Sequence, residues 1–318
     1  RQLDDTATLR LGLPTKLDGV GVQWANSRRH AAFWSGWTAL VSDVKADAGA
    51  HTIAELLEKL PQLTSQLTAA REGMAQQGSP PAAGATLADA LGAHAKQRTW
   101  LTVAQKKAHA AHKQQLSTEG KATLESAGGP GAAAFLLYPT DANCSMEDVY
   151  WQSAVRMRLG MRRPEYTELQ LPHATTACHN KDRQGNVCGQ PLDDGSFHCT
   201  TCQAGGRVLL RHACLAQACG GLVKRWTLQE PAYEQRVTAW DRERRNRSAP
   251  LERAVLDVEY TDANERRWID VSIRHAASGA AVDVARAARR GGEAARRGEH
   301  TKHVRYFGNQ LTAFVVEV

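Results

Sequence analysis

Apolar residues recur at helical spacing through the first third of the chain. Residues 29–127 are rich in Ala, Leu, Gln, Lys and Glu, and one apolar stripe is formed by Ile53, Leu56, Leu57, Leu60, Leu63 and Leu67. The prolines and glycines of residues 76–85 interrupt this pattern, because proline cannot donate the helix hydrogen bond. The pattern predicts a mostly helical N-terminal region over residues 1–125, in two parts, with no motif that indicates its role.

The middle of the chain changes from helical to loop-like. Residues 126–170 contain a predicted helix at 146–159. Its C-terminal end is made basic by Arg156 and Arg158 within it and by Arg162 and Arg163 just after it. These arginines fit a phosphate contact and equally a solvated helix end. Residues 171–206 are full of Gly, Asp, Asn, Thr and Cys, so they hold too few apolar side chains to fold by burial alone.

The last third of the chain alternates short strand-like and helical patterns. Helices are predicted at 207–219 and 280–297, and strands at 222–228, 251–260, 268–274 and 311–318. The order is αβββαβ, and we expect residues 207–318 to form one domain. The predicted fold class is α+β: a helical N-terminal region, a loop-like segment that something other than a core must hold together, and this αβββαβ core.

Composition and charge narrow the class of protein. The chain has 318 residues, 42% of them hydrophobic, and a formal net charge of +7. Such an excess favours an anionic partner such as nucleic acid, although it also occurs in proteins that bind no polyanion. No apolar run approaches the roughly 20 residues of a membrane span, so no membrane partner is expected. Without an initiator Met or a secretory pattern, the chain is expected to be a fragment of a longer polypeptide.

Cysteine and histidine cluster in the loop-like segment at 171–206. Four of the seven cysteines lie there, which is typical of a metal site in a reducing, intracellular compartment. Structural Zn²⁺ takes four tetrahedral N or S ligands, and the expected set is Cys178, Cys188, His198 and Cys202. Cys199 and His179 are alternative ligands, and free thiols in a flexible loop are the alternative to zinc. Cys214 and Cys219 are expected in a core, and Cys144 has no assigned role.

Two aspartates stand out in the predicted strands. A hairpin that turns at Ala263 and Asn264 brings Asp257 directly opposite Asp270. Like charges at that distance destabilise a sheet unless a cation lies between them, so we expect Asp257 and Asp270 to bind Mg²⁺. A turn shifted by one residue would instead place one aspartate on a solvated face.

Other residues could support chemistry at these aspartates. Lys302, at the end of the next helical segment, is the best candidate for a catalytic lysine, and Glu230 for a third carboxylate. Each is equally explained as an ordinary exposed residue. The candidates for contact with a phosphate backbone are Arg211, Arg242, Arg244, Arg245 and Arg247.

The succession of these motifs resembles the C-terminal region of non-LTR retrotransposons that carry a restriction-enzyme-like endonuclease. That family places a CCHC zinc knuckle before an Arg-His helix and two acidic residues 12 to 14 positions apart. Here Arg211-His212 follows the Cys/His cluster, and 12 residues separate Asp257 from Asp270. The likeness covers about residues 126–318. Leu256-Asp257 replaces the family's Pro-Asp, and Ser272 stands where many nucleases of the PD-(D/E)XK fold have lysine, which leaves that role to Lys302.

The resemblance implies a Mg²⁺-dependent endonuclease domain at 207–318 that nicks target DNA to prime reverse transcription. It further implies a zinc knuckle at 171–206, a helical segment at 126–170 before it, a nuclear location, and the element RNA as a second partner. No Tyr-x-Asp-Asp motif occurs here, so a covalent reverse transcriptase would lie N-terminal to the chain. Two alternatives stay open: an inactive zinc-containing module that binds nucleic acid, and a zinc-stabilised protein-interaction domain.

Overall fold

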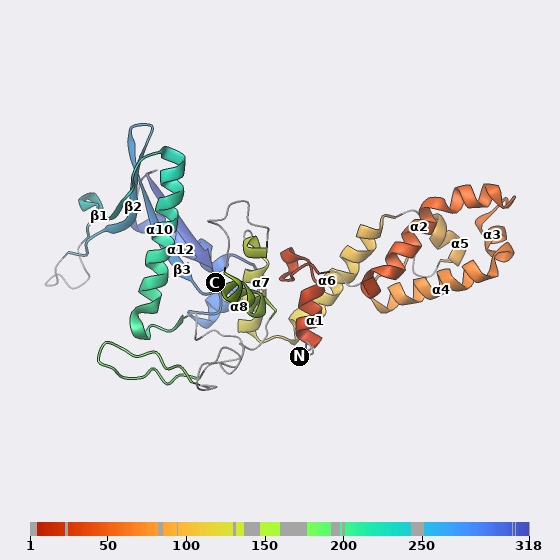
Figure 1. Cartoon of the computed structure of the whole chain (residues 1–318), viewed down its shortest axis with the longest axis horizontal. Helices are drawn as coiled ribbons and strands as arrows, with labels where there is room; N and C mark the ends of the chain where they lie inside the picture. Colours follow the sequence, from red (N-terminus) through yellow and green to blue (C-terminus); the bar gives the residue numbers. More distant parts are fainter. Residues whose placement is uncertain are drawn as a thin grey trace. The chain divides into compact units, whose positions relative to one another are not determined.

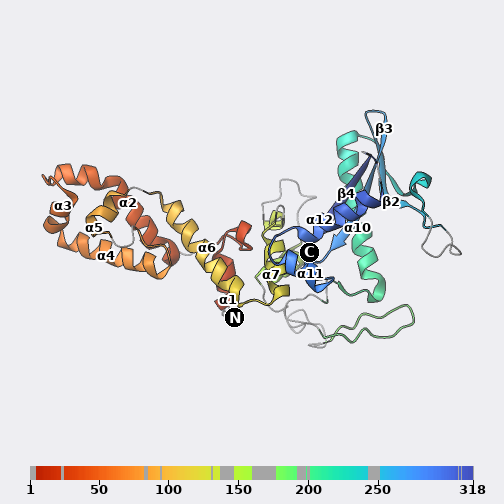
Figure 2. The same ribbon diagram turned by 180° about the vertical axis from the view of Figure 1, so that it is seen from behind.

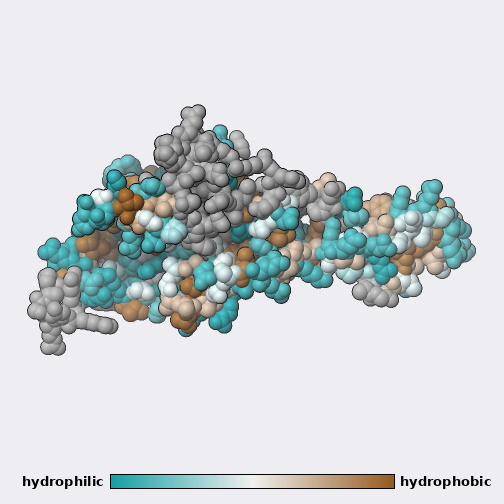
Figure 3. Space-filling view, turned by 90° about the horizontal axis from the view of Figure 1, so that it is seen from below, coloured by the Kyte–Doolittle hydropathy of each residue, from teal (hydrophilic) through white to brown (hydrophobic). Residues whose placement is uncertain are grey.

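The chain folds into two compact units, Arg1–Leu116 and Ser117–Val318. The computed structural model describes residues 5–22, 25–81, 85–93, 95–129, 132–136, 147–159, 177–191, 198, 201–242, 251–306, 308 and 310–317. Within those residues no helix is long and apolar enough to cross a membrane. Among the residues coloured in Figure 3, hydrophilic ones predominate, and hydrophobic residues lie in small groups between them.

The first unit is helical, as the apolar spacing predicts. Its elements are α1 (Asp5–Gly12), η1 (Thr15–Leu17), α2 (Ala25–Asp47), α3 (Ile53–Lys59), α4 (Pro61–Gln76), α5 (Leu87–Gly92) and α6 (Gln97–Gln115). Leu56 and Leu67 of the predicted stripe are fully buried in a core around Trp34. The helix α4 ends at Gln76, where the prolines and glycines begin.

The second unit is built on a four-stranded mixed sheet. Its strands are β1 (Ala232–Arg236), β2 (Val255–Asp262), β3 (Glu265–Arg274) and β4 (Leu311–Glu317), in the order β1-β2-β3-β4. The pairs β1-β2 and β2-β3 are antiparallel, and β3-β4 is parallel. Its helices are α7 (Thr118–Ala127), η2 (Ala134–Leu136), α8 (Asp148–Arg158), η4 (Ala204–Gly206), α10 (Arg207–Thr227), η5 (Thr238–Trp240), α11 (Ala281–Ala287) and α12 (Glu293–Arg305). The predicted α+β class is confirmed.

Helices cover both faces of this sheet. The helix α10 lies in front of it in Figure 1, and its buried face packs on Val258, Ile269 and Val271. Seen from behind, α12 lies in front (Figure 2), where Gly298 sits close to the side chain of Val315 on β4. The helix α7, although predicted as part of the N-terminal region, packs through Ala122 against α11. The helices α10 and α12 thus cover opposite faces of the sheet around β3, whereas β1 is exposed along its whole length.

Three predicted boundaries were wrong. Residues 222–228 are not a strand but the end of α10, because Val223 continues the buried helical stripe of Ala216 and Cys219. The helix stops at Leu228, whose φ of 59° ends it, and the first strand follows only at β1. The strand predicted at 251–260 begins at Val255. The helix predicted at 280–297 is two helices, separated at Gly292, whose φ is 75°.

Candidate metal centre and carboxylate pair

Two of the predicted zinc ligands come from a short hairpin. Residues 177–191 fold back on themselves, with bridges between Ala177 and Pro191 and between Lys181 and Val187. The amide of Cys188 donates to the carbonyl of Asn180 at 2.8 Å, which brings Cys188 beside Cys178. Such a short hairpin with few apolar residues needs a further constraint to stay folded.

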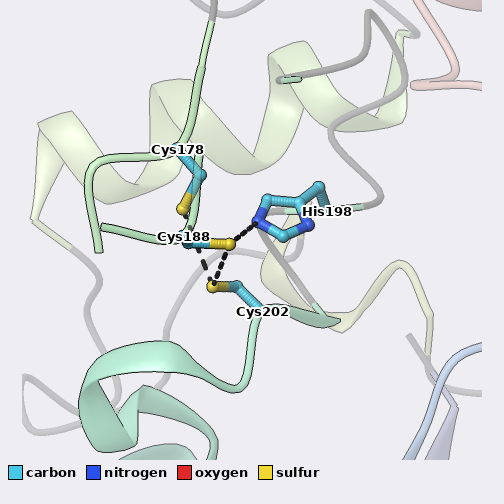
Figure 4. Close-up of side chains that lie close together, drawn as sticks. All are labelled: Cys178, Cys188, His198 and Cys202. Atoms are coloured by element: carbon cyan, nitrogen blue, oxygen red, sulfur yellow. Dashed lines mark hydrogen bonds between the residues drawn. The ribbon is translucent and has the colours of Figure 1, made fainter. Parts of the chain in front are cut away.

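The other two ligands lie one helical turn apart, just before α10. The amide of Cys202 donates to the carbonyl of His198 at 2.8 Å, so their side chains project to the same side. Figure 4 shows all four side chains converging on one point. The ligand atoms of Cys178, Cys188, His198 and Cys202 all lie within 4.8 Å of one another.

The separations fit a tetrahedral zinc ion. The Cys178 and Cys202 sulfurs are 3.6 Å apart, and those of Cys202 and Cys188 are 3.9 Å apart. Nε2 of His198 is 3.4 Å from the Cys188 sulfur. Zn–S bonds of about 2.3 Å at tetrahedral angles put sulfurs roughly 3.7 Å apart. This Cys₃His group could therefore hold a zinc ion; of the alternative ligands, His179 is exposed and Cys199 lies outside the described residues.

The thiols differ in acidity. Burial raises the pKa of the Cys178 thiol. Burial also raises that of Cys202, but hydrogen bonds from the Asn180 side chain and the Ala204 amide outweigh it and lower the pKa of Cys202 to about 7. Among the other cysteines, Cys219 is buried as predicted, whereas Cys214 is exposed. Cys144 lies outside the described residues.

The β2-β3 hairpin has the predicted turn and register. Ala263 and Asn264 both have positive φ, of 47° and 67°. Two-residue hairpin turns of this kind are favoured because their backbone twist matches the right-handed twist of the flanking strands. Cα pairing runs from Asp262 opposite Glu265 to Val258 opposite Ile269. Asp257 and Asp270 are the next residues beyond this last pair, and their side chains lie close enough to interact.

The backbone of β2 departs from regular alternation at Asp257. In a strand, residues two apart share a face. Leu256 nevertheless belongs to a cluster with Trp268 and Tyr306, whereas Val258 packs with Ile269 and Val271. The strand therefore turns over at Asp257, and its carboxylate can lie between β2 and β3. Its Oδ2 accepts a hydrogen bond of 2.6 Å from the amide of Val271.

Asp270 is the more deeply buried aspartate and is paired with a lysine. Its side chain is 6% exposed, and Nζ of Lys302 donates to its Oδ1 at 2.7 Å. Nζ also lies 2.6 Å from Oδ2, so the lysine contacts both oxygens of this carboxylate. Two adjacent carboxylates are a donor set that suits a hard divalent cation.

The electrostatics of Asp257 reflect this crowding. Burial raises its pKa; the Val271 amide and His212 act in the opposite direction, and the adjacent Asp270 raises it further. Burial and the charge of Asp270 likewise raise the pKa of Tyr306. Negative charge at this point is therefore costly in the absence of a cation.

The remaining predicted site residues lie elsewhere or outside the described residues. Glu230 is exposed and pairs with Lys224. It precedes β1, whose Ala232 faces Glu259, so it lies toward the turn of the hairpin and away from Asp257. Arg242 bonds to Glu252 at 2.9 Å, and Arg211 lies in the second turn of α10. Arg244, Arg245 and Arg247 fall outside the described residues.

One residue at the pair, His212, was named from the sequence only as part of the Arg-His motif and was given no role at the aspartates. Nε2 of His212, on α10, lies 3.1 Å from the carbonyl of Val271 and 3.4 Å from Oδ2 of Asp257. The pKa of the Cys219 thiol, two helical turns later on α10, is raised by burial and also by the charge of Asp257. The spacing of His212 and Cys219 on one helix face was the available signal, but only the packing of α10 shows that this face meets Asp257.

Comparison with known proteins assigns no family to the chain. No family model matches it, and neither the curated proteins nor the solved structures contain a significantly similar protein. The Cys₃His group and the carboxylate pair are therefore interpreted from their own geometry.

Proposed function

We propose that this chain is a metal-dependent DNA endonuclease that uses Asp257 and Asp270. The observation that carries the proposal is the convergence of three groups from three elements. Asp257 of β2 and Asp270 of β3 lie side by side, and Lys302 of α12 donates to Asp270 at 2.7 Å. Paired carboxylates that hold a metal ion, with a lysine nearby, can promote hydrolysis of a phosphodiester.

Each residue has a distinct part in this proposal. Asp257 and Asp270 would hold Mg²⁺, which when bound supplies charge stabilisation and a more acidic water. Lys302 offsets negative charge at Asp270 and, once a cation takes that role, can orient a water or a phosphate oxygen. His212 holds Asp257 in place through contacts to its carboxylate and to the Val271 carbonyl.

The arrangement of elements supports the same class of enzyme. The order α10-β1-β2-β3-α11-α12-β4 contains the αβββαβ succession of the PD-(D/E)XK nucleases that the sequence resembles. Ser272 is two positions after Asp270 on β3. In this chain the lysine is contributed by α12 instead. We therefore extend the proposal to a PD-(D/E)XK-like core in residues 207–318.

The zinc group and the wider context complete the proposal. A Zn²⁺ held by the Cys₃His group would fix the hairpin at 177–191 to the start of α10, the helix that carries His212. Basic residues such as Arg211 would then position a DNA backbone. By resemblance, the parent would be a nuclear non-LTR retrotransposon protein with an N-terminal reverse transcriptase, nicking target DNA and binding element RNA.

One observation favours an inactive nucleic-acid-binding module instead. The contact between Lys302 and Asp270 neutralises the buried carboxylate without any metal. In a decayed element this ion pair would be the stable end state, and the zinc group and basic residues alone would remain in use.

Nicking of supercoiled plasmid separates these two functions. The purified chain, loaded with zinc, is incubated with Mg²⁺ or with Ca²⁺, because a chelator would also remove zinc. Mg²⁺-dependent nicking that is lost in Asp257→Asn and in Asp270→Asn supports the endonuclease. A folded chain that binds DNA but does not nick it, with either metal, supports the binding module.

A further inference from the structure

A basic cavity lies within the second unit, formed in part by the strand and the helix that carry Asp270 and Lys302. Its volume is about 730 Å³, and it is lined by the end of β3, the loop that follows, α11 and the first turns of α12. The ionisable residues in its wall include four arginines, Arg274, Arg290, Arg296 and Arg297, and two carboxylates, Asp283 and Glu293. The wall therefore carries a net positive charge even when His275 and His300, which also line it, are neutral.

The internal ion pairs leave two arginines for a ligand. Arg297 pairs with Asp283, and Arg296 bonds to Glu293 at 3.1 Å. Arg274 and Arg290 are exposed and form no ion pair with any described residue. Guanidinium groups that line a concave wall without a carboxylate partner favour an anion, and their planar forks fit phosphate oxygens in particular.

Two further details make the cavity receptive to an anion. Nε of Arg297, a residue of the cavity wall, is buried and has no hydrogen-bond acceptor among the described residues. Gly298, which also lines the wall, would place a Cβ 2.8 Å from Val315 if it had one. The absence of a side chain there lets α12 approach the sheet and keeps Arg274 at the wall.

The position of the cavity relates it to the carboxylate pair. Arg274 follows Asp270 by four residues on β3, which is roughly 13 Å along a strand. Thr301 of the cavity wall precedes Lys302 on α12. The same strand and the same helix thus carry both features, at a separation of a few nucleotides of one DNA strand.

We propose that this cavity binds backbone phosphates of the nucleic-acid strand that runs past the carboxylate pair, through Arg274 and Arg290. The identity of the ligand rests on the proposed function, whereas the preference for phosphate rests on the cavity itself. The phosphates would hold the strand in register so that one phosphodiester lies at Asp257 and Asp270.

The test measures binding of a fluorescein-labelled DNA duplex to the full chain over a range of salt concentrations, with Ca²⁺ in place of Mg²⁺. Arg274→Gln/Arg290→Gln should weaken binding about tenfold. It should also reduce the magnitude of the salt slope, the slope of log K against log salt concentration, by about 2, since each lost phosphate contact removes about 0.9. Arg274→Lys/Arg290→Lys keeps the charge and should retain most of the slope.

A matched variant controls for net charge. Arg266→Gln/Arg289→Gln removes the same two charges from residues of the same unit that do not line the cavity. It should lower the salt slope by far less. Equal losses in the two double variants would mean bulk attraction and would overturn the proposal, as would no loss in either. Unchanged thermal unfolding of each variant is required for the comparison.

Two further measurements distinguish binding of a DNA backbone in this cavity from binding of free phosphate, and test the cavity proposal separately from the endonuclease proposal. Calorimetric titration with inorganic phosphate at constant ionic strength tests for a free-phosphate site. If the cavity variant loses phosphate binding but keeps DNA binding, the nucleic-acid assignment is overturned. If wild-type chain does not nick DNA but its binding depends on Arg274 and Arg290, the cavity proposal stands and the endonuclease proposal fails.

Discussion

Nζ of Lys302 on α12 lies 2.7 Å from Oδ1 of Asp270 on β3, and this contact joins the helix to the middle of the sheet. Both side chains are largely buried, at 18% and 6% exposure. A buried carboxylate that loses its partner keeps its desolvation cost without compensation. The pair is therefore a structural bond as well as part of the proposed site.

Lys302→Ala should destabilise the second unit by about 2–3 kcal/mol, slightly below the range for fully buried pairs because Lys302 keeps some solvent contact. Urea unfolding monitored by tryptophan fluorescence measures this loss. Adding Asp270→Asn to Lys302→Ala removes the stranded charge and should restore much of the stability. If the double variant is no more stable than Lys302→Ala, the pair does not contribute in this way.

The raised pKa of Asp257 should make stability depend on pH. Its folded pKa lies above its unfolded pKa, because burial is the largest effect and the charge of Asp270 adds to it. The folded state therefore binds the proton more tightly, so this contribution is full below the unfolded pKa and is lost as pH rises through the folded pKa.

Asp257→Asn should abolish that slope and, at neutral pH without Mg²⁺, stabilise the chain by up to about 1 kcal/mol, since a like-charge neighbour is removed. The comparison requires urea unfolding of both proteins across the acidic range with zinc retained. A slope of equal size in wild-type and variant would assign the pH dependence to other groups.

Cys202→Ser should lower the zinc content from one ion per chain to none that survives dialysis, because three ligands cannot close a structural site. Elemental analysis measures the content, and limited proteolysis should show the 177–191 hairpin opened. Cys214→Ser is the matched control, as that thiol is exposed and outside the Cys₃His group. Full zinc content in Cys202→Ser would refute the ligand set.

Neighbouring glycines of α10 should respond oppositely to alanine. A Cβ at Gly221 meets nothing within 4 Å, so Gly221→Ala should stabilise the helix by about 0.5–1 kcal/mol. A Cβ at Gly220 would lie 2.2 Å from Oη of Tyr233, so Gly220→Ala must displace β1 or the ring and should cost about 1 kcal/mol net. Thermal unfolding of both variants checks the difference in sign.

His212→Ala should cost about 1 kcal/mol of stability by removing the contact to the Val271 carbonyl. If the endonuclease proposal holds, it should also reduce nicking more than DNA binding, because Asp257 loses a positioning partner. His212→Gln, which can still donate a hydrogen bond, is expected to lie between alanine and wild type. Nicking unchanged in His212→Ala would exclude that positioning role.

Local signals explain which elements the sequence predicts correctly. The stripe from Ile53 to Leu67 packs into the first unit's core, divided between α3 and α4 at Leu60, and the turn at Ala263 and Asn264 sets the hairpin register. The strand predicted at 222–228 was wrong because a short apolar run fits strand and helix alike. Only the continuation of the buried face from Ala216 to Val223 distinguishes the two.

The sequence by itself determined the groups whose chemistry depends on residue type and short spacing: the four residues of the Cys₃His group, and the two aspartates on either side of one hairpin. The tertiary structure decided what meets them. It brought Lys302 from α12 and His212 from α10 to opposite ends of the pair, and it left Glu230 in solvent. Contacts between residues distant along the chain depend on how helices pack on a sheet, and periodicity carries no information about that packing.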